Sequence, residues 1–156
     1  MVERVVLIIL QRGYALSLFV LFIVSACTSP PTHRGGPGPL VRPQPTSPAV
    51  STLLRTAEQE QQAGHLDDAG ATLERALNIE PRNALVWHRL ATLRLQQRRW
   101  DDAEQMALKS NALSGADSAL QAHNWNIIAR VRNATGDVTG ARAAQTKAME
   151  LEHKGN

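Results

Sequence analysis

Small and hydrophobic positions recur at a fixed spacing through most of the chain. The clearest unit is 84–117, in which Trp87 and Ala103 stand among polar residues. Ala69 in the unit before and Ala141 in the unit after take the place of Ala103, and Trp125 takes the place of Trp87. Self-similarity with a period of roughly 20 to 50 residues is typical of repeat architectures, in which each unit buries its apolar side against its neighbours. The pattern predicts three stacked units at about 50–83, 84–117 and 122–155, with an insertion, 118–121, before the third.

The repeated positions resemble the tetratricopeptide (TPR) pattern, which is an antiparallel pair of helices, A and B, in each repeat. Small residues that let two helices approach closely occupy the eighth and twentieth positions of all three units: Ala57, Ala91, Ala129, Ala69, Ala103 and Ala141. The resemblance implies an all-α fold, a TPR helix-pair solenoid of about three repeats within 48–156. The first unit is weak at its seventh and eleventh positions, Thr56 and Glu60. Arg94 replaces the aromatic residue expected at the eleventh position of the second unit, and we expect it to open the groove there.

Capping residues predict where the first helices begin and end. Ser47 followed by Pro48 suits an N-cap and the first helical position. Gly64 supplies the left-handed residue that ends this helix near Ala63. Asp67 and the next aspartate open helix B, where negative charge meets the positive end of the helix dipole.

The segment 1–26 has the composition of a secretory signal. Arg4 and Arg12 precede an apolar run from 14 to 24 that ends in small residues. The continuous apolar core is short for a permanent membrane span. The alternative, a transmembrane anchor beginning at Val5, is interrupted by a polar stretch at 11–13.

The residues at 24–27, Val-Ser-Ala-Cys, resemble the bacterial lipobox, in which a cysteine receives a diacylglyceryl group before cleavage. This resemblance implies a covalent lipid on Cys27, and no other cofactor is expected. Two or three acyl chains hold a protein on a membrane essentially permanently, whereas one chain binds only marginally. Since Thr28 stands where the inner-membrane retention signal has an aspartate, the resemblance implies the periplasmic face of the outer membrane of a Gram-negative bacterium.

Residues 27–47 are rich in proline and glycine and have little apolar bulk to bury. Such a segment is expected to be a disordered tether with polyproline character. At about 3.1 Å per residue its reach is about 60 Å.

Charge and motifs exclude several functions. The chain carries a formal charge of +3, and without residues 1–26 it has 15 basic and 13 acidic residues, or about +2. This balance is unlike a nucleic-acid binder, whose basic residues cluster. The single cysteine excludes an intramolecular disulfide. His88 and His123 can approach each other on neighbouring A helices, but without a carboxylate in phase they make a poor metal site. No catalytic motif is present, and we expect no enzymatic activity and no metal.

A protein partner is expected to bind the concave face that the A helices form in the TPR family. On helical spacing the candidate groove residues are Leu54, Glu58, His88, Thr92, Leu95, Gln96, His123, Asn126, Arg130 and Asn133. A basic edge at the turn of the second repeat comprises Arg94, Arg98 and Arg99, for which simple solvation is the alternative. Val138 and Met149 leave the last helix partly apolar, so the chain is expected to be a monomer or a weak dimer.

The layout of lipobox, short proline-rich tether and small TPR domain resembles the LpoP-type outer-membrane lipoproteins. These proteins activate a bifunctional class A penicillin-binding protein, the peptidoglycan synthase of the inner membrane. The resemblance implies the same role and partner here. Two alternatives stay open, a pilotin or assembly lipoprotein for a type IV pilus secretin and a scaffold for murein hydrolases.

Overall fold

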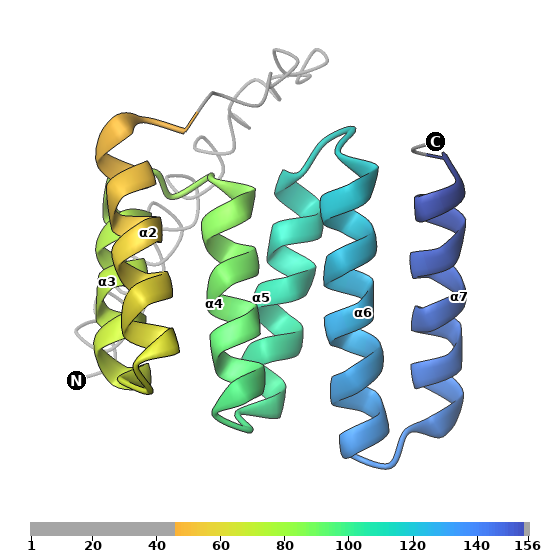
Figure 1. Ribbon diagram of the computed structural model, residues 1–156. Coiled ribbons are helices and arrows are strands. Elements are labelled where there is room, and N and C mark those ends of the chain that lie inside the picture. Colours follow the sequence, from red (N-terminus) through yellow and green to blue (C-terminus); the bar gives the residue numbers. More distant parts are fainter. Residues whose placement is uncertain (1–45, 155–156) are drawn as a thin grey trace, which may run out of the picture. The chain divides into compact units, whose positions relative to one another are not determined.

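A computed structural model describes residues 46–154 of the chain, and within them every regular element is a helix (Figure 1). The elements are α2 (Pro48–Gln62), α3 (Leu66–Ile79), α4 (Ala84–Gln96), α5 (Trp100–Leu113), α6 (Ser118–Ala134) and α7 (Val138–Lys154). The predicted all-α fold of three TPR helix pairs is confirmed. The signal segment, Cys27 and the tether as far as residue 45 lie outside the described residues.

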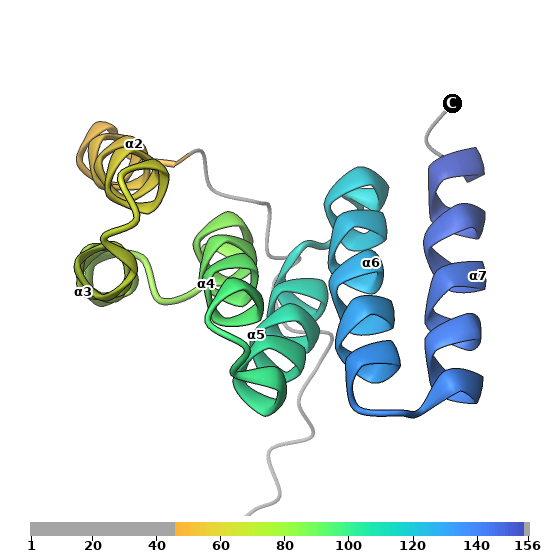
Figure 2. The ribbon, with the colours of Figure 1, turned by 60° about the horizontal axis from the view of Figure 1, so that its bottom comes forward.

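The helices pair in chain order, α2 with α3, α4 with α5 and α6 with α7 (Figure 2). Each later A helix also contacts both helices of the preceding pair, so that α4 packs on α3 and α2, and α6 packs on α5 and α4. The helices B of different repeats are not in contact with one another in this part of the chain. The described helices therefore stack as a solenoid, with A helices touching along one side.

The predicted caps are confirmed. The Ser47 side chain accepts a hydrogen bond from the amide of Val50, with proline at the first turn of α2. Gly64 has a φ of 82° and Gly136 a φ of 88°, which lets the chain reverse between helices A and B. Asn83 caps α4 by accepting from the amides of the second and third helical residues.

The folded domain begins two residues before α2. The amide of Ser47 donates to Glu80 Oε1 at 2.8 Å, and Asn83 Nδ2 donates to the Thr46 hydroxyl at 3.1 Å. Burial tends to raise the pKa of Glu80, but hydrogen bonds from Ser47 and Asn83 outweigh it and lower that pKa. Thr46 and Ser47, assigned to the tether by sequence, are thus fastened to the loop between α3 and α4.

Two apolar clusters make up the core. The first includes Leu73 and Leu90 and lies between the first and second repeats. The second includes Ala107 and Ile128 and lies between the second and third. Each cluster joins helix B of one repeat to helix A of the next, because a single helix pair cannot bury its apolar face alone.

The inserted residues, 118–121, form the first turn of α6 rather than a linker. Asp117 caps this longer helix by accepting from the amide of Leu120 at 2.9 Å. As a result α6 has 17 residues, against 13 to 15 in the earlier helices, and α7 also has 17.

The eleventh position of helix A carries an ion pair across each repeat boundary. Arg94 on α4 pairs with Glu74 on α3 at 3.0 Å, and Arg132 on α6 pairs with Glu104 on α5 at 2.7 Å. Arg94 fits because the facing residue is Gly70, where an added Cβ would lie 3.4 Å from Arg94 Nη1. The expectation that Arg94 opens a groove is wrong, since its side chain fills the space between the first two repeats.

Candidate partner-binding face

The A-helix face is the surface formed by α2, α4 and α6. Two contacts show that these helices present one continuous surface. Gln61 Nε2 donates to Gln96 Oε1 at 2.7 Å between α2 and α4. The rings of His88 and His123 lie 6.2 Å apart between α4 and α6, which confirms their predicted approach.

Nine of the ten sequence-predicted groove residues are at least partly accessible. Leu54, His88, Thr92 and Asn126 are half-buried, and Glu58, Gln96, His123, Arg130 and Asn133 are exposed. They are neutral or basic except for one glutamate. The face therefore offers polar hydrogen-bonding groups to a partner, with one positive charge at Arg130 and one negative charge at Glu58.

Leu95 is not available to a partner. Its side chain is only 7% exposed and belongs to the core cluster between the second and third repeats. The prediction that Leu95 faces the groove is wrong, because its side chain packs in the core cluster with residues of α5 and α6.

The predicted basic edge does not exist as one surface. Arg94 is 7% exposed and bonded to Glu74 and Gln97, so its charge is used inside the domain. Arg99 Nε donates to Asp102 Oδ2 at 2.7 Å, and Arg98 is exposed. Only Arg98 and Arg99 remain on the surface, and Arg99 is already paired with its own helix.

Arg98 occupies the position that Gly64 and Gly136 hold in the other two repeats, and it has a φ of 58°. A left-handed conformation costs roughly 1–2 kcal/mol for an L residue other than glycine. We expect Arg98→Gly to stabilise the domain by about 1 kcal/mol in urea unfolding. The matched change Arg99→Gly, at a φ of −86°, should give no gain. Equal shifts for both variants would show that the backbone at Arg98 stores no strain.

His88 ends a buried polar network that joins α4, α5 and α6. The Ser110 hydroxyl donates to the carbonyl of Ala84 at 2.8 Å, so it accepts from Asn124 Nδ2, also at 2.8 Å. Asn124 Nδ2 also donates to Asn111 Oδ1 at 3.0 Å. The oxygen of Asn124 therefore faces His88 Nδ1, 2.7 Å away, and the proton must be on that nitrogen of His88.

The pKa of His88 is lowered, first by burial and then by the charge of Arg89 and the neighbouring His123, although the bond to Asn124 opposes these effects. The unfolded chain then binds more protons than the folded one just below the ordinary pKa of 6.5, so stability falls as pH drops through this window. The corresponding loss at Glu80 begins only below 4.5.

We expect the melting temperature to fall between pH 7.5 and pH 5.5, and His88→Gln to flatten that fall. The control His153→Gln changes an exposed histidine near the end of α7 and should leave the slope as it is. An unchanged slope in His88→Gln would mean that this histidine does not set the acid sensitivity.

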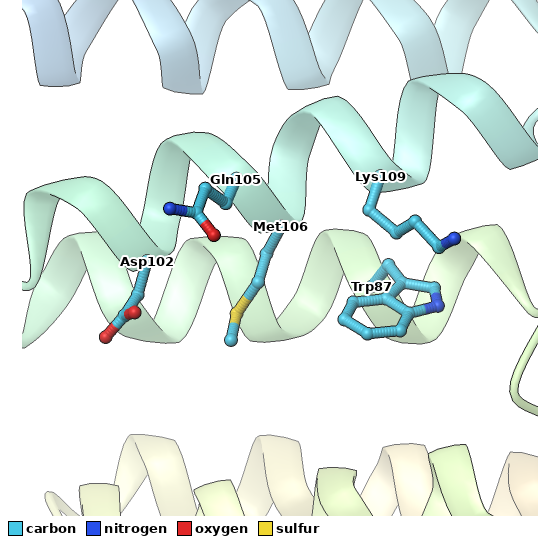
Figure 3. A pocket seen from close by; sticks show the side chains of 5 residues that line it. All are labelled: Trp87, Asp102, Gln105, Met106 and Lys109. Atoms are coloured by element: carbon cyan, nitrogen blue, oxygen red, sulfur yellow. The ribbon is translucent and has the colours of Figure 1, made fainter. Parts of the chain in front are cut away.

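A hollow of about 320 Å³ lies against α4 and α5 of the second repeat (Figure 3). Its lining residues are Trp87 from α4 and Asp102, Gln105, Met106 and Lys109 from α5. Trp87 is half-buried rather than a core residue, and its indole nitrogen donates to the carbonyl of Pro81 at 3.0 Å. Residues 102, 106 and 109 are spaced to lie on one face of helix B, and this spacing could have indicated the hollow from the sequence.

Within residues 46–154 no three histidine, cysteine, aspartate or glutamate side chains come together as metal ligands. None of the described helices is both long and apolar enough to cross a bilayer.

Comparison with known proteins shows which family has this arrangement of helices. The tetratricopeptide-repeat family matches residues 60–123. A search of curated proteins gives no match. Among solved structures, the globular C-terminal domain of LpoP from P. aeruginosa is 42% identical, with a TM-score of 0.65. The match covers 97% of that domain and 66% of this chain. The chain belongs to the LpoP family of TPR proteins.

The match to the LpoP domain covers nearly the whole of that domain, so the likeness extends to a complete folded unit. The family match, at 60–123, begins near the end of α2 and ends in α6. Of the three helices that form the A-helix face, the family match contains α4 completely and only the ends of α2 and α6.

Proposed function

We propose that this protein is an outer-membrane lipoprotein that binds a class A penicillin-binding protein through its TPR domain and activates it. The observation that carries the proposal is the 42% identity over nearly all of the LpoP globular domain. The layout of the chain before that domain supports it, because a lipobox and a proline-rich tether precede the helices. Neither the pilotin nor the hydrolase scaffold gains support from these comparisons.

The contact is assigned to the A-helix face, since solenoids of this kind bind partners along such extended surfaces. Exposed His123 and Arg130 lie on α6, and half-buried Arg89 lies on α4. Only Glu58 on α2 brings an acidic side chain among the candidate residues. Because Glu58 lies on α2, the charge of Arg130 favours a carboxylate in the partner segment that lies over α6.

Activation would be allosteric. A ligand shifts a conformational equilibrium only by its differential affinity for the two states. The TPR domain would bind the active conformation of the synthase more tightly and would supply no chemical group to the reaction. The tether would let a lipid-anchored domain reach a synthase held in the opposite membrane.

Reversing one charge on the A-helix face tests the assigned contact. We expect Arg130→Glu to weaken binding of residues 46–156 to the purified synthase by about tenfold or more, because like charges at an interface cost affinity. Arg75→Glu, an exposed site on α3, is the matched control and should bind normally. Equal binding of both variants and the parent would remove this face from the contact.

The lipid anchor is tested separately. In cells that express the full chain, a labelled fatty acid should be incorporated and the protein should fractionate with the outer membrane. Cys27→Ala should abolish both, because Cys27 is the only cysteine in the sequence. Label on the Cys27→Ala variant, or an unlabelled parent, would contradict the lipoprotein assignment.

A further inference from the structure

The two internal repeat boundaries use a similar polar contact. At each boundary an arginine at the eleventh position of helix A pairs with a glutamate on helix B of the preceding repeat. The pair is Arg94–Glu74 at 3.0 Å at the first boundary and Arg132–Glu104 at 2.7 Å at the second. Glu74 is the twenty-fifth residue of its repeat, and Glu104 is the twenty-first residue of its own, one helical turn earlier.

The apolar part of both boundaries also follows one register. The seventh residue of helix A shares a cluster with the twenty-fourth residue of the preceding repeat. These are Leu90 with Leu73 at the first boundary and Ile128 with Ala107 at the second. Positions 7 and 24 therefore meet at both boundaries, and positions 11 and 21 form the ion pair at the second boundary.

On α2, the residues at positions 7 and 11 have no preceding repeat to pack against among the described residues. The residue at position 7 is Thr56 and that at position 11 is Glu60, so an acid stands where the other repeats have arginine. Glu60 Oε2 is buried and has no hydrogen-bond partner among the described residues. An unsatisfied buried polar atom is costly, and a rotation of the half-buried Glu60 side chain toward the surface would let a cationic donor relieve that cost.

On α7, the residues at positions 21 and 24 have no following repeat to pack against among the described residues. The residue at position 21 is Arg142, where the second repeat has Glu104, and that at position 24 is Gln145. Arg142 and Gln145 are exposed, and Met149 beside them is 49% exposed. Glu60 and Arg142 are thus the charge reverse of the Arg132–Glu104 pair, and their charges are opposite to each other.

We propose that the chain associates head to tail with copies of itself, so that α2 of one copy stacks on α7 of another as α6 stacks on α5. In this register Glu60 meets Arg142 of the other copy, a charge-reversed form of the Arg132–Glu104 pair. A polar end cap alone would keep the domain soluble. A cap of that kind has no need for opposite charges at matched positions of the two ends. The opposite charges of the two ends therefore favour a second copy of the chain as the partner.

Polar contacts between A helices are also possible across the proposed boundary between two copies. Inside the chain, Gln61 at position 12 bonds Gln96 at position 13 of the next repeat. Across the new boundary these positions are Asn133 and Gln62, both exposed amides. A second amide pair can therefore form beside the ion pair.

The contact is weaker than an internal boundary, because Thr56 and Gln145 replace the apolar residues found inside. It is also heterologous, since different surfaces of the two copies meet. Heterologous contacts form rings when the rotation closes and open rows when it does not. The product is a reversible row or ring of domains rather than a symmetric dimer.

Charge reversal with rescue tests the proposal. Sedimentation velocity of residues 46–156 at rising concentration should show mass-action growth beyond the dimer at low salt. The relative's globular domain was solved as a separate unit, so this fragment is suitable. We expect Glu60→Arg and Arg142→Glu each to weaken association by about tenfold or more, and the double variant to restore it. Both substitutions introduce residues that other repeats already carry at these positions, so the fold should tolerate them.

Several results would overturn the proposal. A monomer at every concentration would do so, as would single variants that associate like the parent or a double variant that stays dissociated. Dimers that persist in Glu60→Arg would assign the contact to α7 alone. The synthase is absent from this experiment, so its outcome is independent of the proposed function.

A crosslink measures the geometry directly. Residues 46–156 contain no cysteine, so Thr56→Cys and Gln145→Cys can be introduced together. Mild oxidation should give a ladder of trimers and longer species or closed rings from the double variant. An equal mixture of the two single variants should stop at heterodimers. Homodimers of either single variant, or no crosslink at all, would contradict the head-to-tail register.

Discussion

Replacing Leu90 with alanine is expected to lower the free energy of unfolding by about 3 kcal/mol, within the range found for buried leucines. Leu90 is 1% exposed and lies in the cluster that joins the first repeat to the second. Truncation removes its transfer free energy and leaves a cavity among residues of both repeats. Because a domain of this size has only about 5–15 kcal/mol of stability, the loss is large.

The matched control is Leu108→Ala, which removes the same atoms from a leucine that is 43% exposed on α5. Urea unfolding followed by circular dichroism gives both values. The midpoint should fall for Leu90→Ala with an unchanged slope, which indicates a change in stability alone. Similar midpoints for the two variants would contradict the assignment of Leu90 to the core between repeats.

Asn124→Ala is expected to cost about 3 kcal/mol, because it removes three hydrogen bonds of about 1 kcal/mol each and opens a small cavity. Asn124 is fully buried and bonds to His88, Ser110 and Asn111. No apolar contact replaces these bonds, so the partners are left unsatisfied or must reach water.

Asn126→Ala is the control, since its side chain is half-buried and makes a single long contact of 3.5 Å with Glu152. It should cost about 0.5 kcal/mol or less, as expected for a site near the surface. The two variants are compared by urea unfolding with tryptophan fluorescence. A small loss for Asn124→Ala would mean that the network contributes little net stability.

The fold could be predicted because the repeat phase and the caps agree with one another. The same close approach of two helices is marked in each repeat by one alanine: Ala57, Ala91 and Ala129. The prediction therefore did not depend on the helix propensity of any one segment. Ser47 and Gly64 then set the ends of the first helix, as observed. Consistency across levels is the condition under which a sequence specifies one structure.

Parts of the candidate site could not be predicted, because they depend on partners in a neighbouring repeat. Arg94 is exposed or buried according to what lies opposite, and Gly70 and Glu74 lie on a helix of the preceding repeat. Leu95 sits at the edge of the helical face, where a small rotation decides between groove and core. The insertion at 118–121 was visible as a longer repeat spacing, but the spacing did not show that these residues extend α6 by one turn.

The central claim is that the helical domain activates a class A penicillin-binding protein by binding it. The most direct measurement is the rate of glycan polymerisation by the purified synthase with and without residues 46–156. The account predicts a faster rate that saturates with added domain, and a smaller gain with Arg130→Glu than with Arg75→Glu. A rate that stays the same for every class A synthase of the organism would contradict it.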